Sequence, residues 1–200
     1  VYITGVGMHN DFPIIGKGNL TALNIKDSNL LEWLNGNAFR TSHYPYSEEM
    51  LSLADEYGFL VINETQACGL NNFYPLKTFG PTGLSNNITL SNHKECIRQL
   101  ITRDKNHPSV IMFSLANETA ANEEGSREYY KQIINYARTL TSLPLTMPVS
   151  EFPEEDYLQD LLDITSINMY AGWYTYQGNL PLAKNALEKQ LERYRNQVHQ

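Results

Sequence analysis

Apolar residues along the chain fall into short runs that alternate with stretches of helical periodicity. Six short apolar runs are typical of β-strands, at 2–6, 38–42, 59–62, 110–116, 145–149 and 164–170. Helices are expected between them, over about 25–35, 47–57, 91–103, 123–140 and 180–196, with a weaker helix over 154–162. Strands that alternate with helices in this order predict βα units and a parallel sheet.

The number of these units and the place of the polar residues indicate a barrel. Six units in 200 residues take about 33 residues each, whereas a closed (β/α)₈ barrel takes about 250 residues. We therefore predict an α/β fold, an incomplete (β/α)₈ TIM barrel of about the first six βα units, with residues 1–200 as one partial domain. An open doubly wound sheet of six strands is the competing architecture. The barrel is favoured because polar residues collect at the C-terminal ends of different strands, where barrels build their sites: His9, His43, Glu64, Asn117, Glu118, Asn168 and Tyr170.

An incomplete barrel leaves the edges of its first and last strands uncovered. Both edge strands are apolar here, and an unprotected apolar edge invites pairing between molecules. Residues 1–200 expressed alone are therefore predicted to be poorly soluble or partly molten.

Composition excludes several classes of partner. The chain has 15 basic and 22 acidic residues, a net charge of −7, and no cluster of Lys or Arg, so no nucleic-acid partner is expected. No apolar run approaches the roughly 20 residues that cross a bilayer, so no membrane partner is expected.

The cysteines and histidines predict neither a disulfide framework nor a cofactor. Cys68 and Cys96 have no metal-ligand spacing, and the histidines are scattered singly, so no metal is expected. Free thiols favour a cytoplasmic location. A lysosomal or secreted protein stays possible if a segment before Val1 carries a signal.

Glu118, two residues after the predicted strand 110–116, is the most informative acid of the chain. Asn117-Glu118 follows this strand directly, and desolvation in a partly dry cleft raises the pKa of a carboxylic acid so that it keeps a proton near neutral pH. Glu118 is therefore a candidate general acid. The alternative is that it caps the following helix. The segment 103–108 is interpreted as a charged turn.

Four long motifs resemble glycoside hydrolase family 2. Residues 103–110 (RDKNHPSV) with 114–118 (SLANE) are similar to the acid/base signature of that family. Residues 40–49 (RTSHYPYSEE), 5–11 (GVGMHND) and 168–174 (NMYAGWY) are similar to its β-glucuronidases. The resemblance spans essentially the whole chain.

The resemblance implies a (β/α)₈ barrel that removes a terminal β-linked sugar with retention of configuration, for which two carboxyl groups lie about 5 to 5.5 Å apart. It implies that the substrate is a β-D-glucuronide, that Glu118 is the proton donor and then the base, and that Asn117 binds the sugar's 2-hydroxyl. The positions that line the sugar subsite by resemblance are His43, Asn168, Tyr170 and Tyr174. The full-length protein is expected to be a homo-oligomer.

Further residues are expected to lie around the candidate site and to support it. Arg40 and His9 fit a polar network at the strand ends, in which Arg40 orients carboxylates, and Glu64 has a structural role. Trp173 is expected to wall the pocket or fill core. Two departures from the family pattern are Thr119, where Pro is usual, and Asn63, where Asp is common, which would remove a charge near the site.

The family's nucleophile, a Glu in a Ser/Thr-Glu-Tyr-Gly context, has no match in the chain. The last helix resembles the one before strand seven, so the nucleophile is expected after Gln200, and residues 1–200 alone are expected to be inactive. Two other functions stay open: a β-galactosidase-like enzyme and a truncated, non-catalytic homologue that binds sugars.

Overall fold

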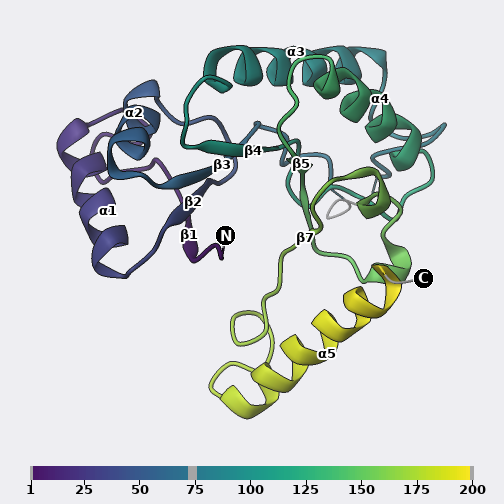
Figure 1. Cartoon of the computed structure of the whole chain (residues 1–200). Coiled ribbons are helices and arrows are strands. Elements are labelled where there is room, and N and C mark those ends of the chain that lie inside the picture. The colour runs from purple at the N-terminus through teal and green to yellow at the C-terminus, as the bar shows by residue number, and fades with distance from the viewer. Residues whose placement is uncertain (1, 72–75, 199–200) are drawn as a thin grey trace.

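Parallel strands form a curved sheet in the computed structural model, which describes residues 2–71 and 76–198. The sheet order follows the chain, with β1 to β5 each paired to the next, and β6 is paired with β7. The strands are β1 Gly5–Met8, β2 Ala38–Thr41, β3 Leu60–Glu64, β4 Val110–Ser114, β5 Leu145–Thr146, β6 Pro148–Val149 and β7 Ser166–Ile167. Only Met147 separates β5 from β6, so these two continue one path, as the predicted strand 145–149 requires. The predicted arc of six strands, an incomplete (β/α)₈ barrel, is confirmed (Figure 1).

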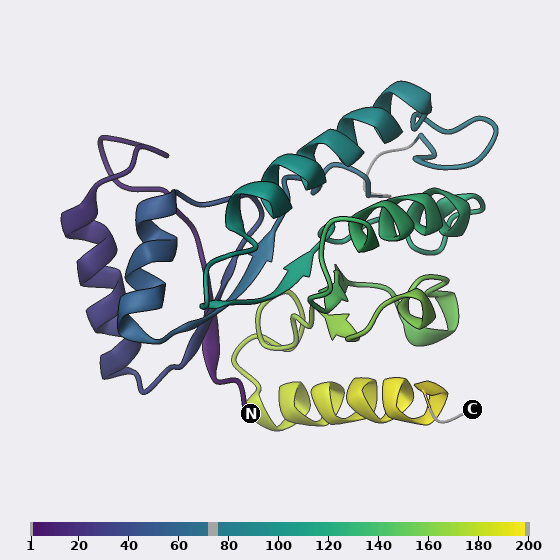
Figure 2. The same ribbon diagram turned by 45° about the horizontal axis from the view of Figure 1, so that its top comes forward.

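The helices cover the outer side of this arc. They are α1 Thr21–Trp33, α2 Glu48–Tyr57, α3 Asn87–Asp104, α4 Ser126–Arg138 and α5 Leu180–Val198. Helix α1 packs against α2 and α3 against α4, whereas α5 lies apart from the sheet (Figures 1 and 2). The helix predicted over 154–162 is wrong: two 3₁₀ turns, η1 Pro153–Glu155 and η2 Gln159–Leu161, stand there, separated by the extended backbone of Asp156. None of the helices in the described ranges is long and apolar enough to cross a membrane.

Capping residues explain where the helices begin and end. The Ser47 hydroxyl accepts the Met50 amide at 3.2 Å at the start of α2, and Gly58 ends that helix in the left-handed region at φ 74°. Helix α3 begins four residues before its predicted start, because the side chain of Asn86 accepts the amides of Ile88 and Thr89 at 2.8 and 3.1 Å.

Several strands begin or end at other residues than the apolar runs predict. Strand β3 extends through Asn63 and Glu64, beyond its predicted end at 62, since both side chains are fully buried and pair in register with β4. The first strand begins at Gly5 rather than at Tyr2, which is 86% exposed. Strand β4 ends at Ser114.

The core lies between the middle strands and helices α2, α3 and α4. Its largest fully buried side chains include Phe39, Leu51, Ile97, Phe113 and Ile133. The edge near α1 differs. Leu31 of α1 is buried, but Leu30 of α1 and Leu34 at its C-terminus are 45% and 58% exposed.

Candidate active site

A buried ion pair lies at the centre of the polar residues at the strand ends. Arg40 in β2 donates from Nε and Nη2 to the two oxygens of Glu64 at the end of β3, at 2.8 and 3.1 Å. Glu64 is fully buried, and Ser114 Oγ donates to its Oε2 at 2.7 Å. Two parallel bonds fix the plane of both groups, which is the geometry expected for Arg40.

The same guanidinium aligns two amides at the tips of β4 and β7. Arg40 Nη2 donates to Asn117 Oδ1 at 2.7 Å, and Arg40 Nη1 lies 3.5 Å from Asn168 Oδ1. Asn168 Nδ2 also donates to Asn117 Oδ1 at 3.1 Å. Because both contacts of the Asn117 side chain fall on its oxygen, its amide nitrogen is directed away from Arg40.

The Glu118 carboxyl is half-buried and is held by two donors. Its Oε1 accepts from Asn168 Nδ2 at 2.8 Å and from the Tyr170 hydroxyl. Burial and the contact with Glu118 raise the pKa of Tyr170, so its phenol stays protonated and donates. The alternative that Glu118 caps the next helix is wrong, because Gly125 is the residue at the N-terminus of α4.

His43 joins this network from the turn after β2. Its Nδ1 lies 2.9 Å from Glu64 Oε1, and assigning the ring proton to Nδ1 gives that buried carboxylate a further donor. The buried Tyr46 ties the turn to neighbouring backbone, since its hydroxyl donates to Met8 O and Ser42 O. His9 is exposed; its ring centroid lies 5.5 Å from that of His43, and its Nδ1 lies 3.4 Å from the Tyr44 hydroxyl.

The aromatic residues after β7 stand at the open side of the site. Tyr174 is 67% exposed, and its ring centroid lies 5.0 Å from that of Tyr170. Trp173 is 71% exposed, so the alternative that it fills core is wrong, and a place in the wall of the pocket stays a prediction.

Two sequence-based interpretations near α3 need correction. The segment 103–108 is a charged turn only after Asp104: Arg103 and Asp104 belong to α3, and Asp104 is fully buried and accepts from Arg103 Nε at 2.5 Å and from Asn63 Nδ2 at 2.7 Å. Asn63 therefore faces α3 from the opposite side of β3 to Arg40, and its missing charge does not act on the Glu118 side of the strand. The hydrogen bond to Asp104 explains an amide at this position.

Sequence reasoning missed three residues of the site's surroundings. Ser114 donates to Glu64 of the network, and Tyr46 donates to backbone carbonyls beside it. The sequence pattern, however, predicts an apolar strand residue for Ser114 and a turn residue for Tyr46. Glu151, two residues after the end of β6, is 8% exposed, and burial raises its pKa to about 6. An acid two residues after the predicted strand 145–149 is the available signal for Glu151.

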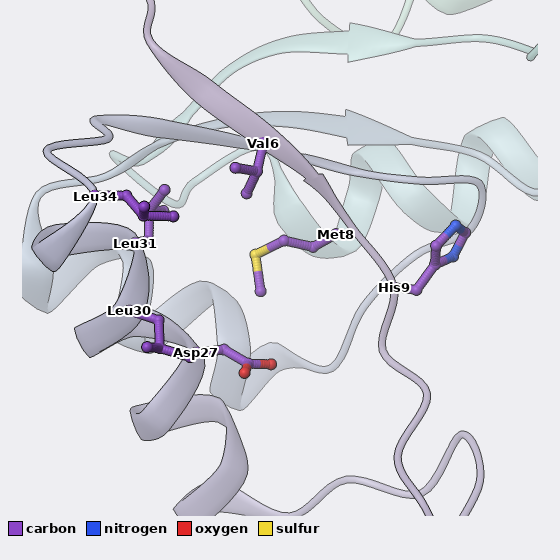
Figure 3. Close-up of a pocket in the computed structure, with 7 residues that line it drawn as sticks. All are labelled: Val6, Met8, His9, Asp27, Leu30, Leu31 and Leu34. Carbon is purple, nitrogen blue, oxygen red and sulfur yellow. The ribbon is translucent and has the colours of Figure 1, made fainter. Parts of the chain in front are cut away.

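Two of the hollows in the described part of the chain differ in the polarity of their lining. One, of about 210 Å³, is lined by Arg40, Ile62, Ser114, Thr146, Pro148, Ser166, Ile167 and Asn168. The other, of about 260 Å³, lies between β1 and α1, where Val6, Met8 and Leu30 face one another and His9 stands off the end of the strand (Figure 3). Only the first has polar groups that converge. In the described ranges, no cluster of three or more His, Cys, Asp or Glu side chains is arranged to hold a metal ion.

Comparisons with known proteins agree on one family. The sequence matches the profile described as "Glycosyl hydrolases family 2, TIM barrel domain" over residues 1–200. It is 43% identical over 198 residues to the β-glucuronidase of Paenibacillus borealis, covering 98% of this chain and 33% of that protein. The structure of β-D-glucuronidase from Dictyoglomus thermophilum superposes with a TM-score of 0.91 at 45% identity, covering 96% of this chain and 34% of that one.

A structure with a bound sugar derivative is also similar. The β-glucuronidase of Ruminococcus gnavus in complex with D-glucaro 1,5-lactone has a TM-score of 0.87 at 36% identity, covering 98% of this chain and 33% of that one. The chain spans about a third of the length of these relatives.

Proposed function

Because the chain belongs to glycoside hydrolase family 2, as part of its TIM barrel domain, we propose that the protein is a retaining exo-glycosidase that hydrolyses terminal β-D-glucuronides. Residues 1–200 would supply the acid/base half of its catalytic pair. One observation carries the proposal: the Glu118 carboxyl stands at the end of β4, held by Asn168 and Tyr170 beside the buried Arg40–Glu64 pair. The relatives named as β-glucuronidases, and the sugar lactone bound by one of them, support the choice of sugar.

Glu118 acts first as acid and then as base in this proposal. Its Oε1 is occupied by two donors, which leaves Oε2 to carry the transferred proton. In the first step that proton passes to the glycosidic oxygen while a carboxylate from outside residues 1–200 attacks the anomeric carbon, and the aglycone leaves as an alcohol. In the second step Glu118 takes a proton from water as the water attacks the same carbon; the bond from that carbon to the carboxylate breaks, which releases the sugar.

The neighbouring amides and rings would bind the sugar. Asn117 has its oxygen occupied by Arg40 and Asn168, so its amide nitrogen is the group that meets the 2-hydroxyl. With Nδ1 of His43 bonded to Glu64, its Nε2 is the ring atom that faces a sugar hydroxyl. Tyr170 and Tyr174 offer a tilted aromatic wall for the apolar face of the ring. Arg40 donates to Glu64, Asn117 and Asn168 and so orients these groups.

The test replaces Glu118 by Gln in the complete gene product that carries residues 1–200. Hydrolysis of phenyl β-glucuronide, whose leaving group needs protonation, is expected to fall by roughly 10²–10⁴-fold, the usual contribution of general acid catalysis. Glu56→Gln, an exposed acid on α2, is the matched control and leaves the rate unchanged. Full activity of Glu118→Gln would remove the assignment.

Substrate pairs separate the other candidate functions. A higher kcat/KM for β-galactosides than for β-glucuronides would favour the β-galactosidase-like alternative. Binding of glucuronic acid without hydrolysis of either substrate would favour the non-catalytic homologue. The homo-oligomer and the cytoplasmic location stay predictions, which sedimentation and fractionation of cells test.

A further inference from the structure

The backbone of Glu118 has a conformation that its own sequence does not favour. Its φ is 46°, in the left-handed region that a non-glycine residue adopts at a steric cost. Such a conformation persists only where the surroundings hold it, and it decides the direction in which the side chain leaves the chain. The contacts around residues 117–120 therefore determine where the Glu118 carboxyl points.

Backbone hydrogen bonds hold residues 117–120 from two sides. The amide of Glu118 donates to Pro148 O in β6 at 2.9 Å. The amides of Asn117 and Ala120 donate to Ala67 O and Leu70 O in the segment after β3, at 3.1 and 2.7 Å. These bonds fix the ends of the turn but leave the residue after Glu118 to be held by its side chain.

Thr119 supplies that side-chain anchor. It is fully buried, and its Oγ1 donates to Leu70 O at 2.9 Å and accepts from the Tyr130 hydroxyl at 2.8 Å. Tyr130 is also fully buried, and burial raises the pKa of its phenol, so the phenol is the proton donor throughout the working pH range. The order of donation is therefore fixed, from Tyr130 to Thr119 to Leu70.

The chain of hydroxyls joins three separate parts of the fold. Tyr130 stands on α4, Thr119 directly follows Glu118, and Leu70 belongs to the segment between β3 and α3. Tyr130 is itself held by ring contacts with Phe79 and Tyr129, at centroid distances of 5.8 and 5.3 Å. The position of the turn is thus set by the packed helix layer.

We propose that Thr119 is a positioning residue for the reaction: its hydroxyl, between Tyr130 and the Leu70 carbonyl, fixes the backbone that aims the Glu118 carboxyl. This rests on the proposed function, since Glu118 is taken as the acid. Removal of the hydroxyl leaves the substrate-binding side chains in place but lets the turn relax. Oε1 of Glu118 then moves from Asn168 and Tyr170, and proton transfer loses its alignment.

The expected signature is a loss that depends on the leaving group. Thr119→Val keeps the shape of the side chain and removes the hydroxyl. Its kcat/KM for phenyl β-glucuronide should fall by about 10²-fold, the scale of a 1 Å misplacement. For 2,4-dinitrophenyl β-glucuronide, whose leaving group needs little protonation, the loss should be smaller by at least about tenfold.

Conservative and matched variants exclude a merely structural role. Thr119→Ser restores the hydroxyl and should recover the phenyl glucuronide rate to within about threefold. Ser126→Ala removes another fully buried hydroxyl, one that donates to Ala121 O at 3.1 Å, and should affect both substrates equally. Tyr130→Phe should resemble Thr119→Val in its leaving-group dependence, and the double variant should be no worse than Thr119→Val alone, since both act through one chain.

Several outcomes would overturn the proposal. These are equal losses of Thr119→Val on both substrates, a Thr119→Ser variant as damaged as Thr119→Val, or a rate of Thr119→Val near that of the wild type. If Thr119→Val does not fold, Tyr130→Phe decides in the same way, because it leaves the Thr119 side chain in place.

A crystal structure separates this proposal from the proposed function. If the wild-type protein hydrolyses no glucuronide, the proposed function fails. The positioning claim still stands or falls on the Asn168 Nδ2 to Glu118 Oε1 distance, 2.8 Å here. This distance should lengthen beyond hydrogen-bonding range in Thr119→Val, and an unchanged distance would refute the claim.

Discussion

The middle of the sheet and its first edge contain similar apolar side chains with opposite burial. In β3 and β4, Val61 and Phe113 are fully buried, because neighbouring strands flank them and the helix layer covers them. At the edge, Val6 of β1 is 38% exposed, and Trp33 of α1 is 80% exposed. An apolar sequence thus predicts burial only where the chain also provides a partner.

The same difference runs through the candidate site. Glu64 and Glu118 are held by β2, β4 and β7 with α3 and α4 behind them. The aromatic residues Trp173 and Tyr174 face solvent on the side without a neighbouring strand. The Arg40–Glu64 pair is therefore fixed by neighbouring strands inside the arc, whereas the Glu118 carboxyl and the exposed rings depend on residues that follow the edge strand β7.

The largest expected effect comes from breaking the buried Arg40–Glu64 ion pair. Glu64→Gln in the complete gene product leaves the Arg40 guanidinium without its buried counter-charge, and should lower the free energy of unfolding by about 3–5 kcal/mol in urea. Glu95→Gln, which breaks the exposed pair with Arg98, is the control and should leave the midpoint unchanged. Equal effects of the two variants would contradict the contrast between buried and exposed sites.

The next effect concerns pH and the buried His93 of α3. Its Nε2 lies 2.8 Å from Leu115 O, and burial lowers its pKa to about 4, against an ordinary value of 6.5. Between these pH values the unfolded chain binds a proton that the folded chain excludes, so this contribution to stability is complete above pH 6.5 and is lost as pH falls toward 4. The loss is about 3 kcal/mol.

His93→Gln should remove this slope. Free energies of unfolding of the wild type and the variant, measured from pH 7 to pH 4, should converge by about that amount as pH falls. Glu151 acts in the opposite direction, because burial raises its pKa to about 6, so its contribution is present at low pH and is lost as pH rises from 4.5 to 6. It is common to both proteins and cancels in their difference. Parallel curves would contradict a neutral, buried His93.

A further pair of variants compares the covered and the uncovered parts of the fold directly. Each variant removes one methylene group. Ile133→Val on α4 should cost about 1 kcal/mol, because Ile133 is fully buried in close packing. Ile25→Val on α1 should change the free energy of unfolding by no more than about 0.5 kcal/mol, because Ile25 is 38% exposed. A comparable cost at both positions in the complete gene product would show that another part of the protein covers α1.

The sequence predicted the architecture well because it depends on local signals. Alternating apolar runs, the Ser47 cap and Gly58 each act within a few residues. It predicted the interior of β3 poorly, since the burial of Asn63 depends on Asp104, a residue 41 positions away. The Thr119 anchor is of the same kind: a buried hydroxyl has no sequence pattern, and its partners Tyr130 and Leu70 come together only in the fold.

The smallest expected effect on the fold is at the apolar hollow between β1 and α1. Leu30 and Leu34 line it and are 45% and 58% exposed, so a change of both to Lys in residues 1–200 removes few packed contacts (Figure 3). The helix content by circular dichroism should stay the same, while self-association measured by sedimentation should decrease, because the lysines place charge beside an edge strand. Unchanged self-association would show that molecules associate elsewhere, for example through the exposed apolar face of α5, where Leu182 and Leu191 are 47% and 50% exposed.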